Sequence, residues 1–127
     1  MTIDDFNGIC QSFGQECRHL LRPKGQELLE QLLAKQADVL VVSASMENWV
    51  RAFFDSKVPV SATRIEVTNG IVTGRLLTRN CYGSEKVERI MSLFPHREDY
   101  RLIAFGDSRG DKEMLDYADE RHYKPFR

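Results

Sequence analysis

The 127-residue sequence lacks the features that mark several large classes of protein. Its three cysteines are odd in number and show no Cys-x-x-Cys spacing, which argues against a disulfide framework and a cysteine zinc site. No apolar run approaches the roughly 18 residues that a membrane-spanning helix needs. The N-terminus, MTIDDFNG, has neither the basic nor the apolar region of a secretion signal. These absences predict a cytoplasmic location, reduced thiols and no membrane insertion.

A net charge of either sign is nearly absent as well. Eighteen basic residues stand against nineteen acidic ones, for a formal charge of -1. No overall field would attract nucleic acid, so we expect no nucleic-acid partner and only local recognition of phosphate. The length suits one globular core.

Helical and strand patterns alternate along the chain. Apolar residues at three- and four-residue spacing predict helices, and short β-branched apolar runs predict buried parallel strands. The expected helices cover residues 3–21 and 23–37, begin near 45 and 84, and include 111–118. In the second helix, the leucines at 28, 29, 32 and 33 should form a buried stripe. The expected strands cover residues 39–43, 101–105 and 121–123. Around Asn69-Gly70, a dipeptide suited to a type I′ turn, period-two alternation over 62–77 predicts a β-hairpin. The order indicates an α/β fold with a mainly parallel sheet.

Polar side chains follow the predicted strands at the edge where parallel sheets bind ligands. Asp107 and Asp111 come after the strand over 101–105, and Ser43 closes the strand over 39–43. Lys86 enters the first turn of a helix between them. Neighbouring carboxylates repel each other, and a divalent metal or another cation between them offsets this repulsion. A hydroxyl beside an ammonium can bind a phosphoryl group. Taken singly, each feature has an ordinary structural explanation: Ser43 as a helix cap or turn residue, Lys86 as a solvated lysine and the loop after residue 105 as a polar turn. Their ordered combination at the strand ends favours a binding site.

Once these residues are considered together, the sequence resembles the haloacid dehalogenase superfamily of Mg²⁺-dependent phosphohydrolases, and most closely its phosphoserine-phosphatase-like members. VLVVSAS resembles the family's second motif, NCYGSEKVERI its third and LIAFGDSRGDKEML its fourth. The resemblance implies a Rossmann-like three-layer sandwich, phosphomonoester hydrolysis, Mg²⁺ as cofactor and a small phosphorylated substrate.

The resemblance also implies a role for each motif residue. Asp107 would be the direct Mg²⁺ ligand, and Asp111 would orient Lys86 or bind the metal through water. Ser43 would donate a hydrogen bond to a phosphoryl oxygen, and Lys86 would offset the charge of the phosphate. The remaining candidates would line the substrate crevice: Ala44, Ser45, Asn80, Tyr82, Gly106, Ser108 and Arg109.

One departure from the family pattern concerns the nucleophile. The first motif, an apolar strand running into D-x-D-G-T or D-x-D-G-V, has no counterpart here. Asp4-Asp5 lies at a helix start and Asp38 precedes its strand, so neither can replace it. Residues 1–21 resemble the last helix of a helical cap, and residues 22–127 a partial core domain without its central first strand. We therefore expect the isolated chain to be inactive.

Several alternatives stay open at this point. The two strands beside the missing one could pair directly, another copy or another polypeptide could fill the slot, or the segment could be only marginally stable. We favour association, either as a homo-oligomer or with a complementing N-terminal fragment. The chain could also be a non-catalytic partner that binds phosphate and metal. A phosphorelay receiver domain is disfavoured, because its phosphorylated Asp precedes its Ser and Lys, whereas here the order is Ser43, Lys86, Asp107.

Overall fold

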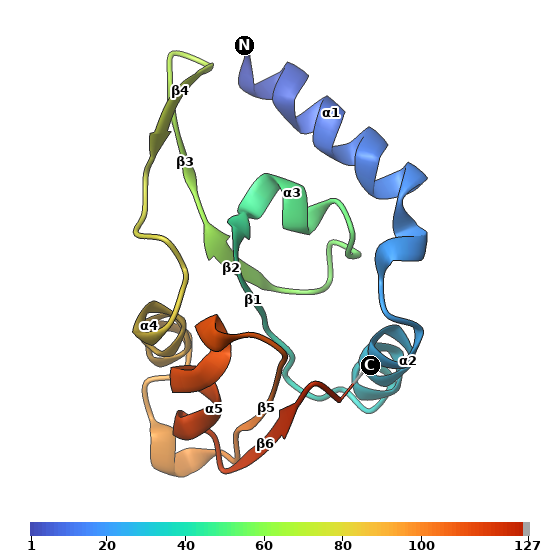
Figure 1. Ribbon diagram of the computed structural model, residues 1–127, viewed down its shortest axis with the longest axis vertical. Helices are drawn as coiled ribbons and strands as arrows, with labels where there is room; N and C mark the ends of the chain where they lie inside the picture. The colour runs from blue at the N-terminus through green and yellow to red at the C-terminus, as the bar shows by residue number, and fades with distance from the viewer. Residues whose placement is uncertain (126–127) are drawn as a thin grey trace.

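The computed structural model describes residues 1–125 and alternates helices with strands (Figure 1). The helices are α1 (Ile3–Glu16), α2 (Pro23–Ala34), α3 (Glu47–Arg51), α4 (Ser84–Leu93) and α5 (Lys112–Tyr117), with 3-10 turns η1 (Arg18–Leu20), η2 (Arg97–Asp99) and η3 (Arg109–Asp111). The strands are β1 (Val41–Met46), β2 (Val60–Thr63), β3 (Ile65–Thr68), β4 (Ile71–Leu76), β5 (Ile103–Gly106) and β6 (Glu120–Tyr123). The predicted α/β class is confirmed. The last two residues of the segment 22–127 lie outside the described residues.

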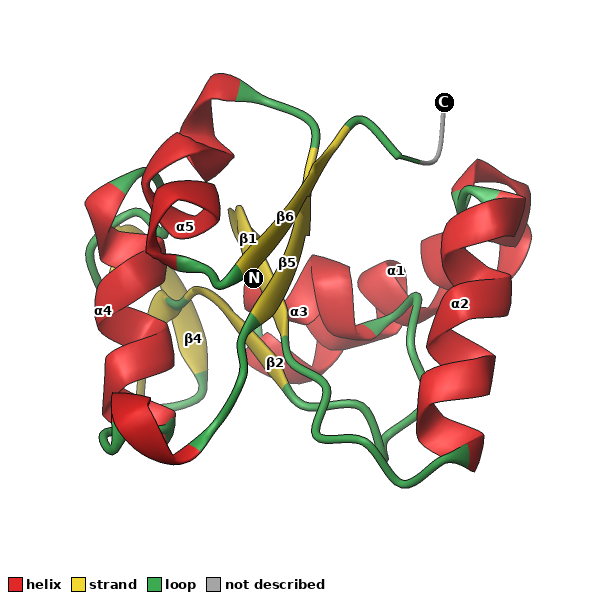
Figure 2. Cartoon of the chain, turned by 90° about the horizontal axis from the view of Figure 1, so that it is seen from below, coloured by secondary structure: helices red, strands yellow, loops and turns green. Residues whose placement is uncertain are grey.

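The strands form three separate two-stranded sheets. In parallel pairs, β1 joins β2 with Val41 opposite Val60, and β5 joins β6 with Ile103 opposite Glu120. Within residues 1–125, no strand pairing joins β1 to β5, although both lie between α2 and the α4–α5 pair (Figure 2). Direct pairing of these two strands, one of the three open alternatives, is therefore not formed.

The antiparallel β3–β4 hairpin follows the prediction closely. Asn69 and Gly70 have φ values of 51° and 76°, as a type I′ turn requires, and Thr68 stands opposite Ile71. The start of the chain adds to this hairpin, because the Ile3 N–H donates to the Gly70 carbonyl at 2.8 Å. The local turn chemistry was sufficient to place this element.

Four predicted boundaries were wrong. β1 continues past Ser43 to Met46, and α3 begins at Glu47 rather than near residue 45. The pairing of β1 with β2 shifts register between Val42 and Met46, so the strand passes through an irregular stretch that its sequence does not reveal. The segment predicted as one hairpin from residue 62 is divided, because its first residues belong to β2. The first helix ends at Glu16 and is followed by η1.

The buried core consists of two clusters rather than one. The first contains Ile90, Ala104, Met114, Leu115 and Ala118, and the second contains Val50, Val60 and Ala62. No residue of α2 is buried. The leucines at 28, 29 and 32 are half-buried and Leu33 is exposed, so the predicted buried stripe was wrong. Helix α2 lies to one side of β1 and β5 (Figure 2), and within residues 1–125 no strand pairing joins these two strands.

Helix α1 packs against α3. The ring of Phe13 stacks on Trp49 with centroids 4.1 Å apart and meets Phe53 edge-on at 5.9 Å. Gly14 allows this approach, because a Cβ there would lie 2.4 Å from the Ala52 carbonyl oxygen. The division into a cap remnant and a core domain at residue 21 stays a prediction. Among residues 1–125, no helix combines the length and apolar character that crossing a bilayer requires.

We expect Gly14→Ala to destabilise the chain by about 1–3 kcal/mol, because the added methyl group would collide with the α3 backbone. Gly8→Ala is the matched control in the same helix, since a Cβ there meets nothing within 4 Å. That control should raise stability by up to about 1 kcal/mol, through the better helix propensity of alanine. Urea unfolding of both variants tests the packing of α1, and equal effects at the two positions would contradict it.

Candidate functional site

A polar pocket of about 430 Å³ lies at the carboxyl ends of β1 and β5. Ser43, Lys86, Asp107 and Asp111, which come from distant parts of the sequence, all line it. The complete lining is Arg22, Val42, Ser43, Ala44, Ser45, Lys86, Phe105, Gly106, Asp107, Ser108, Asp111 and Pro125.

The centre of the pocket is a buried ion pair. The Lys86 Nζ lies 2.7 Å from Asp111 Oδ1, and the two side chains are 8% and 11% exposed. The same ammonium donates to the carbonyl of Val42 in β1 at 3.3 Å. Gly83 sets the start of α4, with a φ of 61° that glycine adopts readily, and its N–H donates to the Gly110 carbonyl at 2.9 Å. Lys86 therefore reaches both β1 and the loop after β5 from the first turn of α4.

Both oxygens of Asp111 are engaged. While Oδ1 accepts from Lys86, Oδ2 accepts from the N–H groups of Asp107 at 3.0 Å and Ser108 at 3.2 Å. Burial by itself would raise the pKa of Asp111, but the hydrogen bond and charge of Lys86, together with the two N–H groups, lower this pKa below its ordinary value. Asp111 is thus a charged group that fixes Lys86 and the turn after β5.

The oxygen chemistry of the pocket suits Mg²⁺, but the donor set is too small. Mg²⁺ takes about six oxygen ligands in near-octahedral geometry. Within residues 1–125, no group of three or more His, Cys, Asp or Glu side chains is placed to hold a metal ion. The oxygens of Asp111 are used by Lys86 and by the turn, which leaves Asp107 as the carboxylate nearest such a role. These residues alone do not make a complete Mg²⁺ site.

Ser43 lies inside β1 and lines the same pocket. The Ser45 N–H donates to Ser43 Oγ at 3.1 Å, which holds the hydroxyl oxygen in place. Ala44 and Ser45 line the pocket beside it, and Gly106 and Ser108 line it from the other strand. A phosphoryl group in the pocket would meet hydroxyl groups, backbone and an ammonium.

Three of the predicted lining residues lie elsewhere. Asn80, Tyr82 and Arg109 do not line the pocket, and Tyr82 packs against Gly110, where a Cβ would lie 2.6 Å from the Tyr82 ring. Sequence reasoning missed Arg22 and Pro125, which do line it. Arg22 precedes Pro23 at the start of α2. Reasoning from the residues at strand ends does not consider a helix start that faces those strand ends. The Arg22-Pro23 pair nevertheless indicates a helix start in the sequence.

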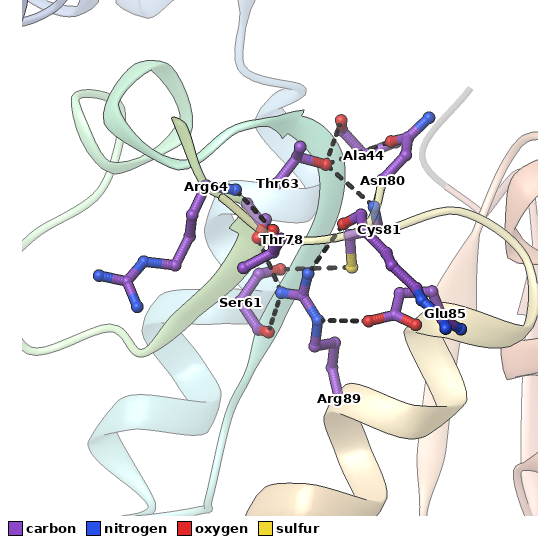
Figure 3. A network of polar contacts seen from close by, with 11 residues as sticks. Ala44, Ser61, Thr63, Arg64, Thr78, Asn80, Cys81, Glu85 and Arg89 are labelled. Atoms are coloured by element: carbon purple, nitrogen blue, oxygen red, sulfur yellow. Dashed lines mark hydrogen bonds and ion pairs between the residues drawn. The ribbon is translucent and has the colours of Figure 1, made fainter. Parts of the chain in front are cut away.

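Asn80 belongs instead to a polar network behind the pocket (Figure 3). The Thr63 hydroxyl lies 2.9 Å from the Ala44 carbonyl and 3.1 Å from Asn80 Oδ1, and it accepts from the Cys81 N–H at 2.9 Å. This hydroxyl holds the irregular part of β1, the end of β2 and the segment before α4 together.

Arg89, one turn after Lys86, anchors α4 to the same network (Figure 3). Its Nε pairs with Glu85 Oε1 at 3.1 Å, and Nη1 donates to Ser61 Oγ at 3.1 Å and to the Ala62 carbonyl at 2.7 Å. Its Nη2 donates to the Arg79 carbonyl at 3.1 Å. Arg89 thereby fixes the helix that carries Lys86 against β2.

We expect Asp111→Asn to lower the free energy of unfolding at pH 7 by about 3–5 kcal/mol, because it leaves the buried Lys86 ammonium without its anion. Asp116→Asn is the control. Its carboxylate is 55% exposed in a pair with Lys112, so the loss should stay under about 1 kcal/mol. Urea unfolding of both variants measures the difference, and similar losses would contradict a special role for the buried pair.

The difference in the free energy of unfolding between the wild-type chain and Asp111→Asn should depend on pH in a definite direction. Because the pKa of Asp111 is lowered on folding, the stability from its charge is fully present above the ordinary value of 3.8 and is lost as the pH falls through the lower folded-state pKa. The stability gap between the wild-type chain and Asp111→Asn should therefore narrow in acid. A gap that stays constant from pH 7 to pH 3 would argue against the pair.

The chain is similar to known proteins over most of its length. It is 37% identical over 112 residues to the protein CicA of Caulobacter vibrioides, in strains NA1000 / CB15N and ATCC 19089 / CIP 103742 / CB 15, which covers 85% of this chain and 50% of CicA. The chain thus spans about half the length of the curated relatives that it matches.

Two solved structures share the fold. A Bordetella pertussis Tohama I protein of unknown function superposes with a TM-score of 0.81 at 20% identity, covering 95% of this chain and 58% of that one. Cytosolic 5'-nucleotidase IIIB, solved with cytidine, superposes with a TM-score of 0.67 at 17% identity, covering 89% and 43%. The profile of haloacid dehalogenase-like hydrolases matches residues 2–116. The chain therefore belongs to the haloacid dehalogenase-like hydrolase family.

Proposed function

We propose that this chain supplies the phosphate-binding part of a Mg²⁺-dependent phosphomonoester hydrolase and does not turn over substrate by itself. The observation that supports this proposal is the convergence of Ser43, Lys86, Asp107 and Asp111 on one pocket at the carboxyl ends of two parallel strands. Family membership supports hydrolase chemistry. Membership of the phosphoserine-phosphatase-like subgroup is part of this proposal, and the substrate is given only as a small phosphomonoester, because the residues that line the pocket do not select one.

The proposed roles follow from the contacts. Lys86 places a positive charge beside the phosphoryl oxygens, and Asp111 orients that ammonium through its contact at 2.7 Å. Ser43 donates its hydroxyl proton to a phosphoryl oxygen while its own oxygen accepts from Ser45. Mg²⁺, when bound, would neutralise further phosphate charge, with Asp107 as this chain's carboxylate ligand.

Arg22 is a further candidate for binding the phosphate. Lys86 is largely neutralised by Asp111, so the pocket needs another cation to attract a dianion. Arg22 lines the pocket from the start of α2, and its guanidinium makes no ion pair within residues 1–125. A planar guanidinium can bind two phosphate oxygens at once.

The carboxylates that line the pocket do not supply the nucleophile. Covalent phosphoryl transfer needs a carboxylate in line with the phosphorus and the leaving group. Both oxygens of Asp111 accept hydrogen bonds, one from Lys86 and one from the turn after β5, and Asp107 would bind the metal. Without the nucleophile, what remains is binding and electrostatic stabilisation.

We expect the isolated chain to hydrolyse p-nitrophenyl phosphate with Mg²⁺ at a rate close to background. Loss of a nucleophile commonly costs several orders of magnitude, as about 10⁶-fold in subtilisin illustrates. Asp107→Asn should not change this residual rate. Robust turnover by the chain alone, abolished by Asp107→Asn, would show that the nucleophile has been misplaced.

We expect Mg²⁺ to bind the isolated chain weakly, at millimolar concentrations, because one carboxylate and water supply too little of its coordination. In an NMR titration, amide shifts should be confined to residues 106–111. Asp107→Asn should remove them, and Asp116→Asn, whose carboxylate pairs with Lys112 away from the pocket lining, should not. Tight binding, or no response at all, would count against the assignment.

A non-catalytic phosphate-binding partner is the second candidate function. It is favoured by the presence of Arg22, Ser43 and Lys86 in a pocket whose carboxylates are otherwise engaged. Orthophosphate should then shift the amides of residues 43–45, and Arg22→Ala should weaken that binding severalfold. If the chain binds orthophosphate but no added N-terminal fragment restores hydrolysis of p-nitrophenyl phosphate, this candidate is favoured over the hydrolase.

A further inference from the structure

The strand β1 is irregular where it lines the polar pocket. Val42 lies opposite Ser61 of β2, and the next aligned pair is Met46 with Thr63. β1 thus advances four residues, from 42 to 46, while β2 advances two, from 61 to 63. Bulges of this kind often lie beside functional sites, because they re-aim side chains. Residues 43–45, which we call the pocket bulge, all line the pocket.

The Thr63 hydroxyl contacts the pocket bulge from outside the pocket lining (Figure 3). Thr63 is 3% exposed and does not line the pocket, so its hydroxyl would not touch a bound phosphate. The hydroxyl accepts from the Cys81 N–H at 2.9 Å. It lies 2.9 Å from the Ala44 carbonyl, within the bulge, and 3.1 Å from Asn80 Oδ1. Because a hydroxyl has one proton, it donates to one of these two oxygens at a time, and the contact with Ala44 is the shorter.

The side chain of Cys81 provides a second link to the pocket bulge. Its sulfur accepts a hydrogen bond from the Ser43 N–H and lies 3.9 Å from the Ser61 carbonyl oxygen. Cys81 is fully buried. The chain at Cys81 is therefore joined to the bulge twice, directly at Ser43 and through Thr63 at Ala44.

The same segment leads into the helix that carries Lys86. Gly83, two residues after Cys81, is the N-cap of α4, and the Lys86 N–H donates to its carbonyl at 3.1 Å. The Lys86 ammonium in turn donates to the carbonyl of Val42, which precedes the bulge, at 3.3 Å. The bulge and the start of α4 are thus joined on two sides, by Lys86 inside the pocket and by Thr63 with Cys81 outside its lining.

We propose that Thr63 is a positioning residue of the phosphate-binding pocket. Without contacting phosphate, its hydroxyl fixes the pocket bulge against the start of α4, so that Ser43 and Lys86 bind the same phosphoryl group. Loss of the hydroxyl leaves the Ala44 carbonyl and the Cys81 N–H without this partner, and the bulge loses the contact that sets its position. This inference rests on the proposed phosphate-binding role of Ser43 and Lys86.

A purely structural role for Thr63 makes a different prediction. A hydroxyl that only stabilised the core would lower the free energy of unfolding when it is lost, but the folded chain would keep its affinity for phosphate. A positioning hydroxyl changes the affinity of the folded chain, and a substitution that keeps the hydroxyl preserves that affinity. Affinity and stability are therefore measured separately on each variant.

Orthophosphate binding to the whole chain is followed by NMR, through the amide signals of the pocket bulge, and stability is followed by urea unfolding. Thr63→Val, which removes the hydroxyl and keeps nearly the same shape, should weaken orthophosphate binding about tenfold. Thr63→Ser, which keeps the hydroxyl and loses the methyl group, should bind within about twofold of the wild-type chain. Unchanged affinity in Thr63→Val, or a Thr63→Ser affinity as weak as that of Thr63→Val, would overturn the proposal.

Val60→Ala is the matched control in the same strand. Val60 is buried, pairs with Val41 before the bulge and does not line the pocket. Its truncation should lower the stability in urea, as core truncations do, and leave the orthophosphate affinity within about twofold of the wild-type value. Equal losses of affinity in Val60→Ala and Thr63→Val would show that general destabilisation weakens binding, which contradicts a positioning role.

A double-mutant cycle locates the action of Thr63 in the pocket bulge. If the hydroxyl acts through Ser43, removing the Ser43 hydroxyl first leaves less for Thr63→Val to disturb. In the Ser43→Ala background, Thr63→Val should therefore weaken orthophosphate binding by less than about threefold, because residues that act through one another are not additive. An undiminished effect in that background would mean that Thr63 acts elsewhere, and the proposal would be wrong.

The positioning role and the proposed function can fail separately. Without any ligand, amide hydrogen exchange at Ser43 and Cys81 should be at least about tenfold faster in Thr63→Val and close to wild-type in Thr63→Ser. Orthophosphate binding that is insensitive to Thr63→Val overturns the positioning role and leaves the proposed function standing. Absence of orthophosphate binding by the wild-type chain counts against the proposed function. The exchange measurement then still tests Thr63, because unchanged exchange in Thr63→Val would show that its hydroxyl does not hold the bulge.

Discussion

The buried ion pair between Lys86 and Asp111 is the interaction on which the rest of this structure depends. The β1–β2 and β5–β6 sheets share no strand pairing within residues 1–125, yet Lys86 bonds to Val42 in the first and to Asp111 after the second. Removing one partner of a buried pair costs about 3–5 kcal/mol, a large part of the stability of a small domain. The group that would face a phosphate is therefore also the group that holds the two halves of the fold together.

This double role limits what Lys86 and Asp111 can do chemically. Asp111 directs one oxygen to Lys86 and the other to the turn after β5, so it orients the ammonium instead of attacking a substrate or completing a metal site. Arg89 and Thr63 hold α4 and the irregular part of β1 in place behind them. The result is a polar pocket lined by two cationic side chains, Arg22 and Lys86, and two carboxylates, Asp107 and Asp111.

Two features outside the pocket go together with the arrangement of the strands. The leucines of α2 are at most half-buried, and the buried core is divided into two clusters. Within residues 1–125, no strand pairing joins β1 to β5, so the two parallel pairs form separate sheets. The chain belongs to the haloacid dehalogenase-like hydrolase family and spans about half the length of CicA.

Local sequence determined the elements whose signals are short-range. Asn69-Gly70 fixed the hairpin because only its left-handed backbone fits that turn, and the apolar run ending at Gly106 fixed β5. Ser43, Lys86, Asp107 and Asp111 were found because strand ends carry ligands, and all four line the pocket. Tertiary structure alone decided the rest. The end of β1 depends on its register with β2, and Arg22 reaches the pocket from a helix start. Helix α2 buries no residue, although its leucines form an apolar stripe. Each of these depends on contacts between residues distant in sequence, which no local pattern encodes.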